Sequence, residues 1–110
     1  MESKRQYTRI YLSLPMEFHV QLVDSNQFWE SRATLKNISK GGLYFECGTA
    51  PQLKRGNVAE FTFTTDPAKF GLVKSPMKAK AVVKRIEARV AGTENYGIAL
   101  EFLGAPRFET

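Results

Sequence analysis

The chain has 110 residues, 43% of them hydrophobic, and a formal net charge of +5 from 16 Lys and Arg against 11 Asp and Glu. This length and composition suit one domain with a packed core and argue against a disordered chain. Cys47 is the only cysteine, which excludes an internal disulfide framework and a cysteine-rich metal site. No apolar run approaches membrane-spanning length and no apolar segment follows the charged N-terminus, so we expect a cytoplasmic protein without a signal peptide.

Apolar and polar residues alternate in several runs along the chain, whereas helical periodicity is weak. The polar and basic residues 1–12 are expected to form an N-terminal arm. The first strand is predicted over residues 16–23, where alternate positions are apolar: Met16, Phe18, Val20 and Leu22. A turn then leads to a second strand over residues 29–38, and a short third strand begins at residues 43–45.

Three further strands are predicted over residues 58–64, 77–88 and 96–103. In the last of these strands, Gly97, Ala99 and Glu101 are expected on the outer face. Six antiparallel strands joined mostly by short turns predict an all-β fold that closes into a small barrel and so removes exposed sheet edges. We expect the barrel to cover residues 13–104 and residues 105–110 to form a short tail.

The N-terminal arm contains two arginines four residues apart, Arg5 and Arg9, and Lys4 precedes them. Guanidinium groups bind phosphate oxygens through paired N–H donors and can also lie flat on a purine face. In an extended arm these arginines would lie at most about 13 Å apart, so they could grip opposite sides of one compact ligand. A solvated basic tail is the alternative interpretation.

A short polar turn follows the second predicted strand and contains Asn37, Ser39, Gly41 and Gly42. An Asn amide, a Ser hydroxyl and glycine N–H groups can hydrogen-bond a base edge or an anion. Taken alone, the turn is also explained as a plain β-turn with glycines at its strained positions. Together, the arginine pair and the turn favour a phosphorylated purine as the ligand.

Three sequence signatures together resemble the PilZ domain family: K-R-x-x-x-R in the arm, N-x-S-x-G-G in the turn and Y-G-I-A-L-E-F in the last strand. The resemblance runs from Lys4 to about Phe102. It implies a PilZ-like split barrel of six antiparallel strands that binds cyclic di-GMP, a bacterial second messenger. It also implies that Arg5 and Arg9 embrace the phosphates and stack on guanine.

The resemblance also implies that the turn recognises the edge of a guanine base. The residues involved are Asn37, Ser39 and Gly42, with Gly41 beside them. Lys4 stands where ligand stoichiometry is tuned in the family, so one or two bound molecules stay open. The implied function is a receptor or adaptor whose N-terminal arm becomes ordered on the ligand and then signals to an unidentified downstream protein. Motility, exopolysaccharide synthesis and virulence are all compatible outputs.

Two other functions stay open at this point. A small basic β-barrel could bind single-stranded nucleic acid through aromatic side chains and through Lys78, Lys80 and Lys84, although a polar outer face explains these lysines more simply. A PilZ-like protein-interaction domain that does not bind the nucleotide is the second alternative. We do not expect an enzyme, a metal, a cofactor or a membrane partner, because His19 is the only histidine, no carboxylate pair suits acid–base chemistry and no metal-ligand spacing occurs.

Overall fold

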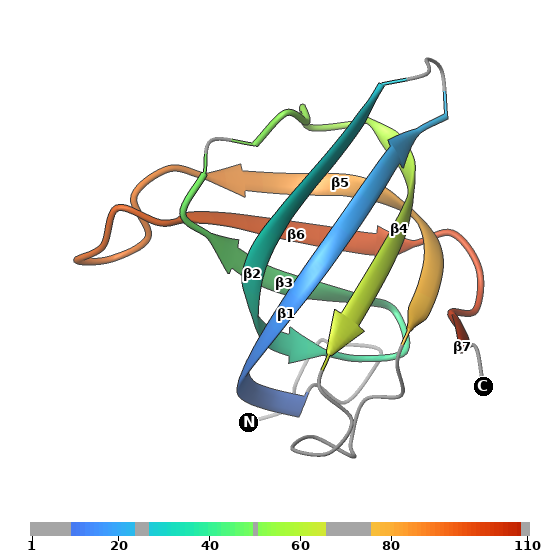
Figure 1. The fold of residues 1–110 in the computed structure, drawn as a ribbon, viewed down its shortest axis with the longest axis horizontal. Coiled ribbons are helices and arrows are strands. Elements are labelled where there is room, and N and C mark those ends of the chain that lie inside the picture. Colours follow the sequence, from blue (N-terminus) through green and yellow to red (C-terminus); the bar gives the residue numbers. More distant parts are fainter. Residues whose placement is uncertain (1–9, 24–26, 50, 66–75, 109–110) are drawn as a thin grey trace, which may run out of the picture.

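Antiparallel strands wind around a single core and close into a barrel (Figure 1). The structure is a computed structural model that describes residues 10–23, 27–49, 51–65 and 76–108. The arm residues Lys4, Arg5 and Arg9 lie outside the described residues. The strands, in chain order, are β1 (Ile10–Leu22), β2 (Phe28–Ile38), β3 (Gly42–Cys47), β4 (Val58–Thr65), β5 (Met77–Glu87), β6 (Tyr96–Phe102) and β7 (Arg107–Phe108).

The strands lie side by side in the order β4-β1-β2-β3-β6-β5, and pairing of β4 with β5 closes the ring. Every pairing is antiparallel. The predicted all-β fold, a six-stranded antiparallel barrel, is therefore confirmed. The two-residue β7, which lies in the predicted tail, adds to β5 by pairing with Met77 and Lys78.

Alternating apolar residues from all six long strands fill the barrel, as the sequence pattern predicts. Aromatic rings dominate its centre: the Phe18 ring packs edge-on against Trp29 with centroids 4.8 Å apart and lies 4.9 Å from Phe45. Phe45 in turn packs against Phe63 at 6.0 Å. Contacts of this kind join strands that are distant in sequence, so the closed barrel depends on this aromatic centre.

β1 is longer than the sequence pattern predicts. It begins at Ile10 instead of Met16, and residues 10–12, expected in the arm, pair with the end of β2 through Ile10↔Ile38 and Tyr11↔Asn37. Pro15 lies within this strand and pairs with Thr34 of β2. On its other side it has no partner strand, because β4 pairs with β1 only from Met16 onward. A proline that lacks a neighbouring strand on one side is compatible with a sheet, which is why it does not end β1 here.

Gly97 lies on the outer face of β6, as predicted, but it is buried there because the side chain of Tyr44 covers it. Within the described ranges, no helix has the length and hydrophobicity needed to traverse a bilayer.

Candidate functional site

The polar turn between β2 and β3 is fixed to its surroundings by short hydrogen bonds. The Ser39 N–H donates to the Gly42 carbonyl at 2.9 Å, and the Gly41 N–H donates to the Ser39 hydroxyl oxygen at 3.2 Å. The Phe102 N–H donates to the Gly41 carbonyl at 2.9 Å, which ties the turn to the end of β6. Ser39 therefore shapes the turn itself, and the turn is held rigidly on the barrel.

Gly42 has a structural reason to be glycine. It lies opposite Glu101 in the β3–β6 pair, where a Cβ atom would overlap the carbonyl oxygen of Leu100 and lie 3.2 Å from the Glu101 Cα. These neighbours are backbone atoms of the adjacent strand, so they cannot rotate away. The glycine permits β3 to approach β6 closely at the start of the pairing.

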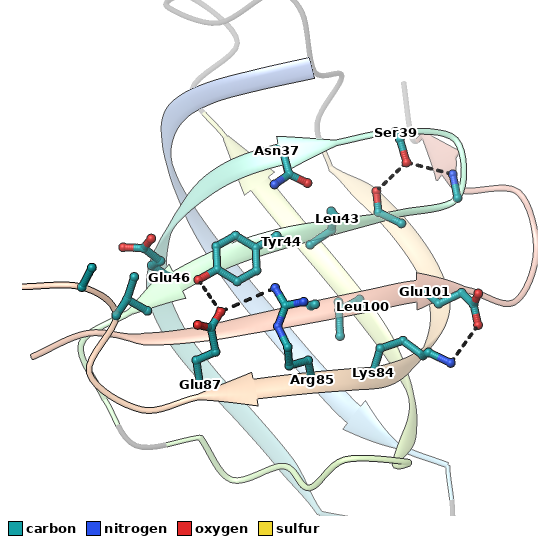
Figure 2. A pocket seen from close by; sticks show the side chains of 15 residues that line it. Asn37, Ser39, Leu43, Tyr44, Glu46, Lys84, Arg85, Glu87, Leu100 and Glu101 are labelled. Atoms are coloured by element: carbon teal, nitrogen blue, oxygen red, sulfur yellow. Dashed lines mark hydrogen bonds and ion pairs between the residues drawn. The ribbon is translucent and has the colours of Figure 1, made fainter. Parts of the chain in front are cut away.

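An open groove of about 680 Å³ begins at this turn and crosses the outer faces of β3, β6 and β5 (Figure 2). Its lining comes from residues 37–46, 84–91 and 99–101. The four predicted turn residues, Asn37, Ser39, Gly41 and Gly42, all line it and so are brought together at one end. The volume lies within the range of small-ligand sites, which is about 300–1,000 Å³.

Two β-bulges direct polar side chains into this groove. A register shift between Leu35 and Asn37 breaks the alternation of β2, so Asn37 faces outward beside Tyr44 although strict alternation from Leu35 would point it inward. A second shift, between Val83 and Arg85, places Lys84 and Arg85 together on the outer face of β5. The Asn37 amide makes no hydrogen bond to any described residue and is available to a ligand.

Next to Asn37, on the side of the groove away from Ser39, a group that we call the Tyr44 cluster is formed by Tyr44, Glu46, Arg85 and Glu87 (Figure 2). The Tyr44 hydroxyl donates to Glu87 Oε1 at 3.3 Å, and the Arg85 guanidinium lies 3.5 Å from the same oxygen. The Arg85 guanidinium carbon is 5.7 Å from the centre of the Tyr44 ring. Burial, followed by the charges of Glu87 and Glu46, raises the pKa of Tyr44 to about 12, so its hydroxyl stays protonated at neutral pH.

Carboxylates offset the positive charge of the described groove. Lys84 lies 3.8 Å from Glu101, and Arg85 is paired with Glu87, whereas Glu46 has no ion-pair partner among the described residues. Two cations and three carboxylates therefore line the groove, which gives this part of it a net charge of about −1. A site for an anionic ligand needs further positive charge from elsewhere in the chain.

The Tyr44 cluster was not predicted from the sequence. Tyr44 lies two residues beyond Gly42 on a strand that alternates inward and outward, so its outward position next to the turn could have been inferred. Arg85 and Glu87 are more than 40 residues away from Tyr44 in sequence, and the bulge that orients Arg85 has no local sequence signal.

No group of three or more His, Cys, Asp or Glu side chains in the described ranges could hold a metal ion.

Comparison with known proteins assigns this barrel to a class. The PilZ domain model matches residues 3–107, and the chain therefore belongs to the PilZ domain family. The fold is similar to that of the Bacillus subtilis inhibitor of motility MotI/DgrA, with a TM-score of 0.68, 22% identity and coverage of 94% of this chain and 44% of that chain. It is also similar to the PilZ domain of YcgR from Escherichia coli, solved with c-di-GMP, with a TM-score of 0.63, 21% identity and coverage of 93% and 79%.

The chain thus spans less than half of the Bacillus subtilis structure. At these identities the two likenesses concern the fold. No curated protein matches the chain in sequence.

Proposed function

We propose that this chain is a receptor for cyclic di-GMP. The observation that carries the proposal is the pairing of Tyr11 with Asn37, because it brings the start of β1 to the rim of the groove beside the polar turn. Arg9 directly precedes β1 in the sequence, so a chain segment with Lys4, Arg5 and Arg9 leads into the strand at this point. Membership of the PilZ domain family supports the same ligand.

The charge distribution indicates which part of the site binds which part of the ligand. The described groove has no net positive charge, so the phosphates of the ligand depend on Arg5 and Arg9, whose charge-assisted hydrogen bonds would contribute on the order of 1.5–3 kcal/mol each. The available Asn37 amide and the N–H groups of the turn suit the edge of a guanine base. Ser39 and Gly42 hold the turn in shape, as the hydrogen bonds and the close β3–β6 approach indicate.

The signalling step follows from this division. A ligand that binds the arm arginines and the rigid turn at the same time would order residues 1–9, which precede β1, against the barrel. The surface formed in this way is the one that a downstream protein partner would recognise. A binding role of this kind requires no catalytic group, and we infer that the protein is an adaptor instead of an enzyme.

Calorimetric titration with cyclic di-GMP tests the proposal. We expect Arg5→Ala and Arg9→Ala each to weaken binding at least about tenfold, which corresponds to the loss of about 1.4 kcal/mol. Arg32→Ala is the matched control, because Arg32 pairs with Glu17 at 3.9 Å on the outer face of β1 and β2, away from the groove. Unchanged affinity in both arm variants would exclude the arm from the site.

Titrations with other ligands separate the alternatives. Binding to single-stranded oligonucleotides that falls steeply with salt would favour a nucleic-acid-binding barrel. The outer face of β5 argues against this function, because Lys80 lies opposite Glu60 and Lys84 is paired with Glu101. Failure of the wild-type protein to bind any guanine nucleotide would favour a protein-interaction domain.

A further inference from the structure

The Tyr44 ring is held in a fixed position on the outer face of the barrel. The ring covers Gly97, where a Cβ atom would overlap the Tyr44 hydroxyl and lie 2.7 Å from the adjacent ring carbon. The ring fits in this position only because residue 97 has no side chain. The hydroxyl is bound to Glu87 at 3.3 Å, and Arg85 lies near the ring and is paired with the same carboxylate. The ring is only partly buried, so a flat group can still contact it.

Strand register places carboxylates on both sides of this ring. Glu46 on β3 and Glu87 on β5 both lie opposite Gly97 on β6, so the two carboxylates flank the residue that the ring covers. The Glu46 carboxylate makes no hydrogen bond or ion pair with the described residues, and it therefore has free acceptor positions. An aromatic surface with acceptors at its rim is the result.

The Tyr44 cluster adjoins the turn at Asn37 and extends from there across the groove to β5. Asn37 lies opposite Tyr44, Tyr44 opposite Ala99, and Ala99 opposite Arg85. At the usual spacing of neighbouring strands, the Cα atoms of Asn37 and Arg85 are about 14 Å apart across this row. A ligand with two bases can contact both ends of the groove at once.

Charge indicates which part of a nucleotide the Tyr44 cluster suits. Phosphate is disfavoured there, because Arg85 is already neutralised by Glu87 and because Glu46 adds an unpaired negative charge. Guanine, in contrast, presents two adjacent donors on its Watson–Crick edge, N1–H and the N2 amino group, and a carboxylate accepts both. Adenine presents an acceptor at N1, which a carboxylate repels.

We propose that the Tyr44 cluster is a guanine-reading subsite in which a base stacks on Tyr44 and Arg85 and donates its N1–H and N2 amino hydrogens to Glu87 or Glu46. This inference rests on the proposed function and specifies the base that the far end of the groove selects. The arm then binds the phosphates, the turn contacts one base and the cluster reads the other. The groove therefore distinguishes cyclic di-GMP from cyclic di-AMP by carboxylates that lie outside the family signatures.

Titrations with both cyclic dinucleotides test this inference. We expect Glu87→Gln, Glu46→Gln and the double variant to lower affinity for cyclic di-GMP, the double variant by at least about tenfold, and to reduce the preference over cyclic di-AMP. Glutamine keeps the size of the side chain and an acceptor oxygen, so the Tyr44 hydroxyl retains a partner. Glu17→Gln is the control, because Glu17 is also paired with an arginine, at 3.9 Å, but on another face of the barrel.

The outcomes separate the two proposals. If the wild-type protein binds neither dinucleotide, the proposed function is wrong and the subsite is wrong with it. If the wild-type protein binds cyclic di-GMP and the glutamine variants bind it equally or more tightly, the receptor function stands. The carboxylates would then only repel the ligand, and the guanine-reading subsite is refuted. Selective loss of cyclic di-GMP affinity in the glutamine variants, with Glu17→Gln unchanged, supports it.

Discussion

Gly42→Ala separates the folding role of the N-x-S-x-G-G signature from the binding role that we propose for it. The added methyl group would overlap the Leu100 carbonyl oxygen and lie 3.1 Å from the Leu100 carbonyl carbon, so β3 and β6 must move apart. Overpacking of this kind costs about 1–3 kcal/mol. Two hydrogen bonds next to the substitution, Ser39 N–H to Gly42 O and Phe102 N–H to Gly41 O, are each 2.9 Å long and contribute about 1 kcal/mol each when intact.

Partial loss of these bonds brings the expected decrease in the free energy of unfolding to about 2–4 kcal/mol. With a urea m-value of about 2 kcal/mol per molar, the unfolding midpoint should fall by roughly 1–2 M. Urea unfolding without ligand, followed by intrinsic fluorescence of the buried Trp29, measures this change directly.

Gly104→Ala is the matched control, because nothing lies within 4 Å of a Cβ atom at Gly104. Its stability should stay the same or rise slightly. An unchanged midpoint in Gly42→Ala would refute the close-approach argument and return Gly42 to a role in ligand binding alone.

Two further substitutions test the core and the Tyr44 cluster. Phe45→Ala should lower the free energy of unfolding by about 3–5 kcal/mol, because Phe45 is fully buried, whereas Phe28→Ala, at 58% exposure, should have a small effect in the same urea assay. Tyr44→Phe should change the alkaline stability profile. The folded-state pKa of Tyr44 is raised to about 12 from 10.0, so protonated Tyr44 stabilises the fold fully below pH 10, and this contribution is lost as the pH rises to 12. Thermal unfolding from pH 9 to 12 should therefore show a steeper loss in the wild-type protein than in Tyr44→Phe, and parallel profiles would contradict the assigned pKa.

The sequence predicts most of the barrel because strands that are buried on one side show a period of two. This pattern identifies the inward residues of β5 and β6, such as Val83, Ile98 and Leu100, all of which are buried. It misses the first part of β1, where Pro15 and a bulge between Tyr11 and Leu14 interrupt the alternation. Propensity at single positions is weak evidence there, because pairing with β2 outweighs it.

The polar turn could be predicted because its residues are adjacent in the sequence. The Tyr44 cluster could not, since it depends on the register of β3, β6 and β5 and on the bulge before Arg85. A bulge moves every following side chain to the opposite face, and no residue type marks it reliably. The outward position of Asn37 has the same origin, because the bulge after Leu35 turns its side chain toward the groove.

The pairing of β3 with β6, from Gly42↔Glu101 to Cys47↔Tyr96, joins the two walls of the groove, and these walls are separated by about half of the chain. A ligand that occupies the groove consequently binds the native protein and not the unfolded chain. At one hundred times its dissociation constant, such a ligand adds about 2.7 kcal/mol to stability by mass action. Proteases in the cell degrade unfolded chains preferentially, so the abundance of this protein would rise and fall with the concentration of any messenger that binds in the groove.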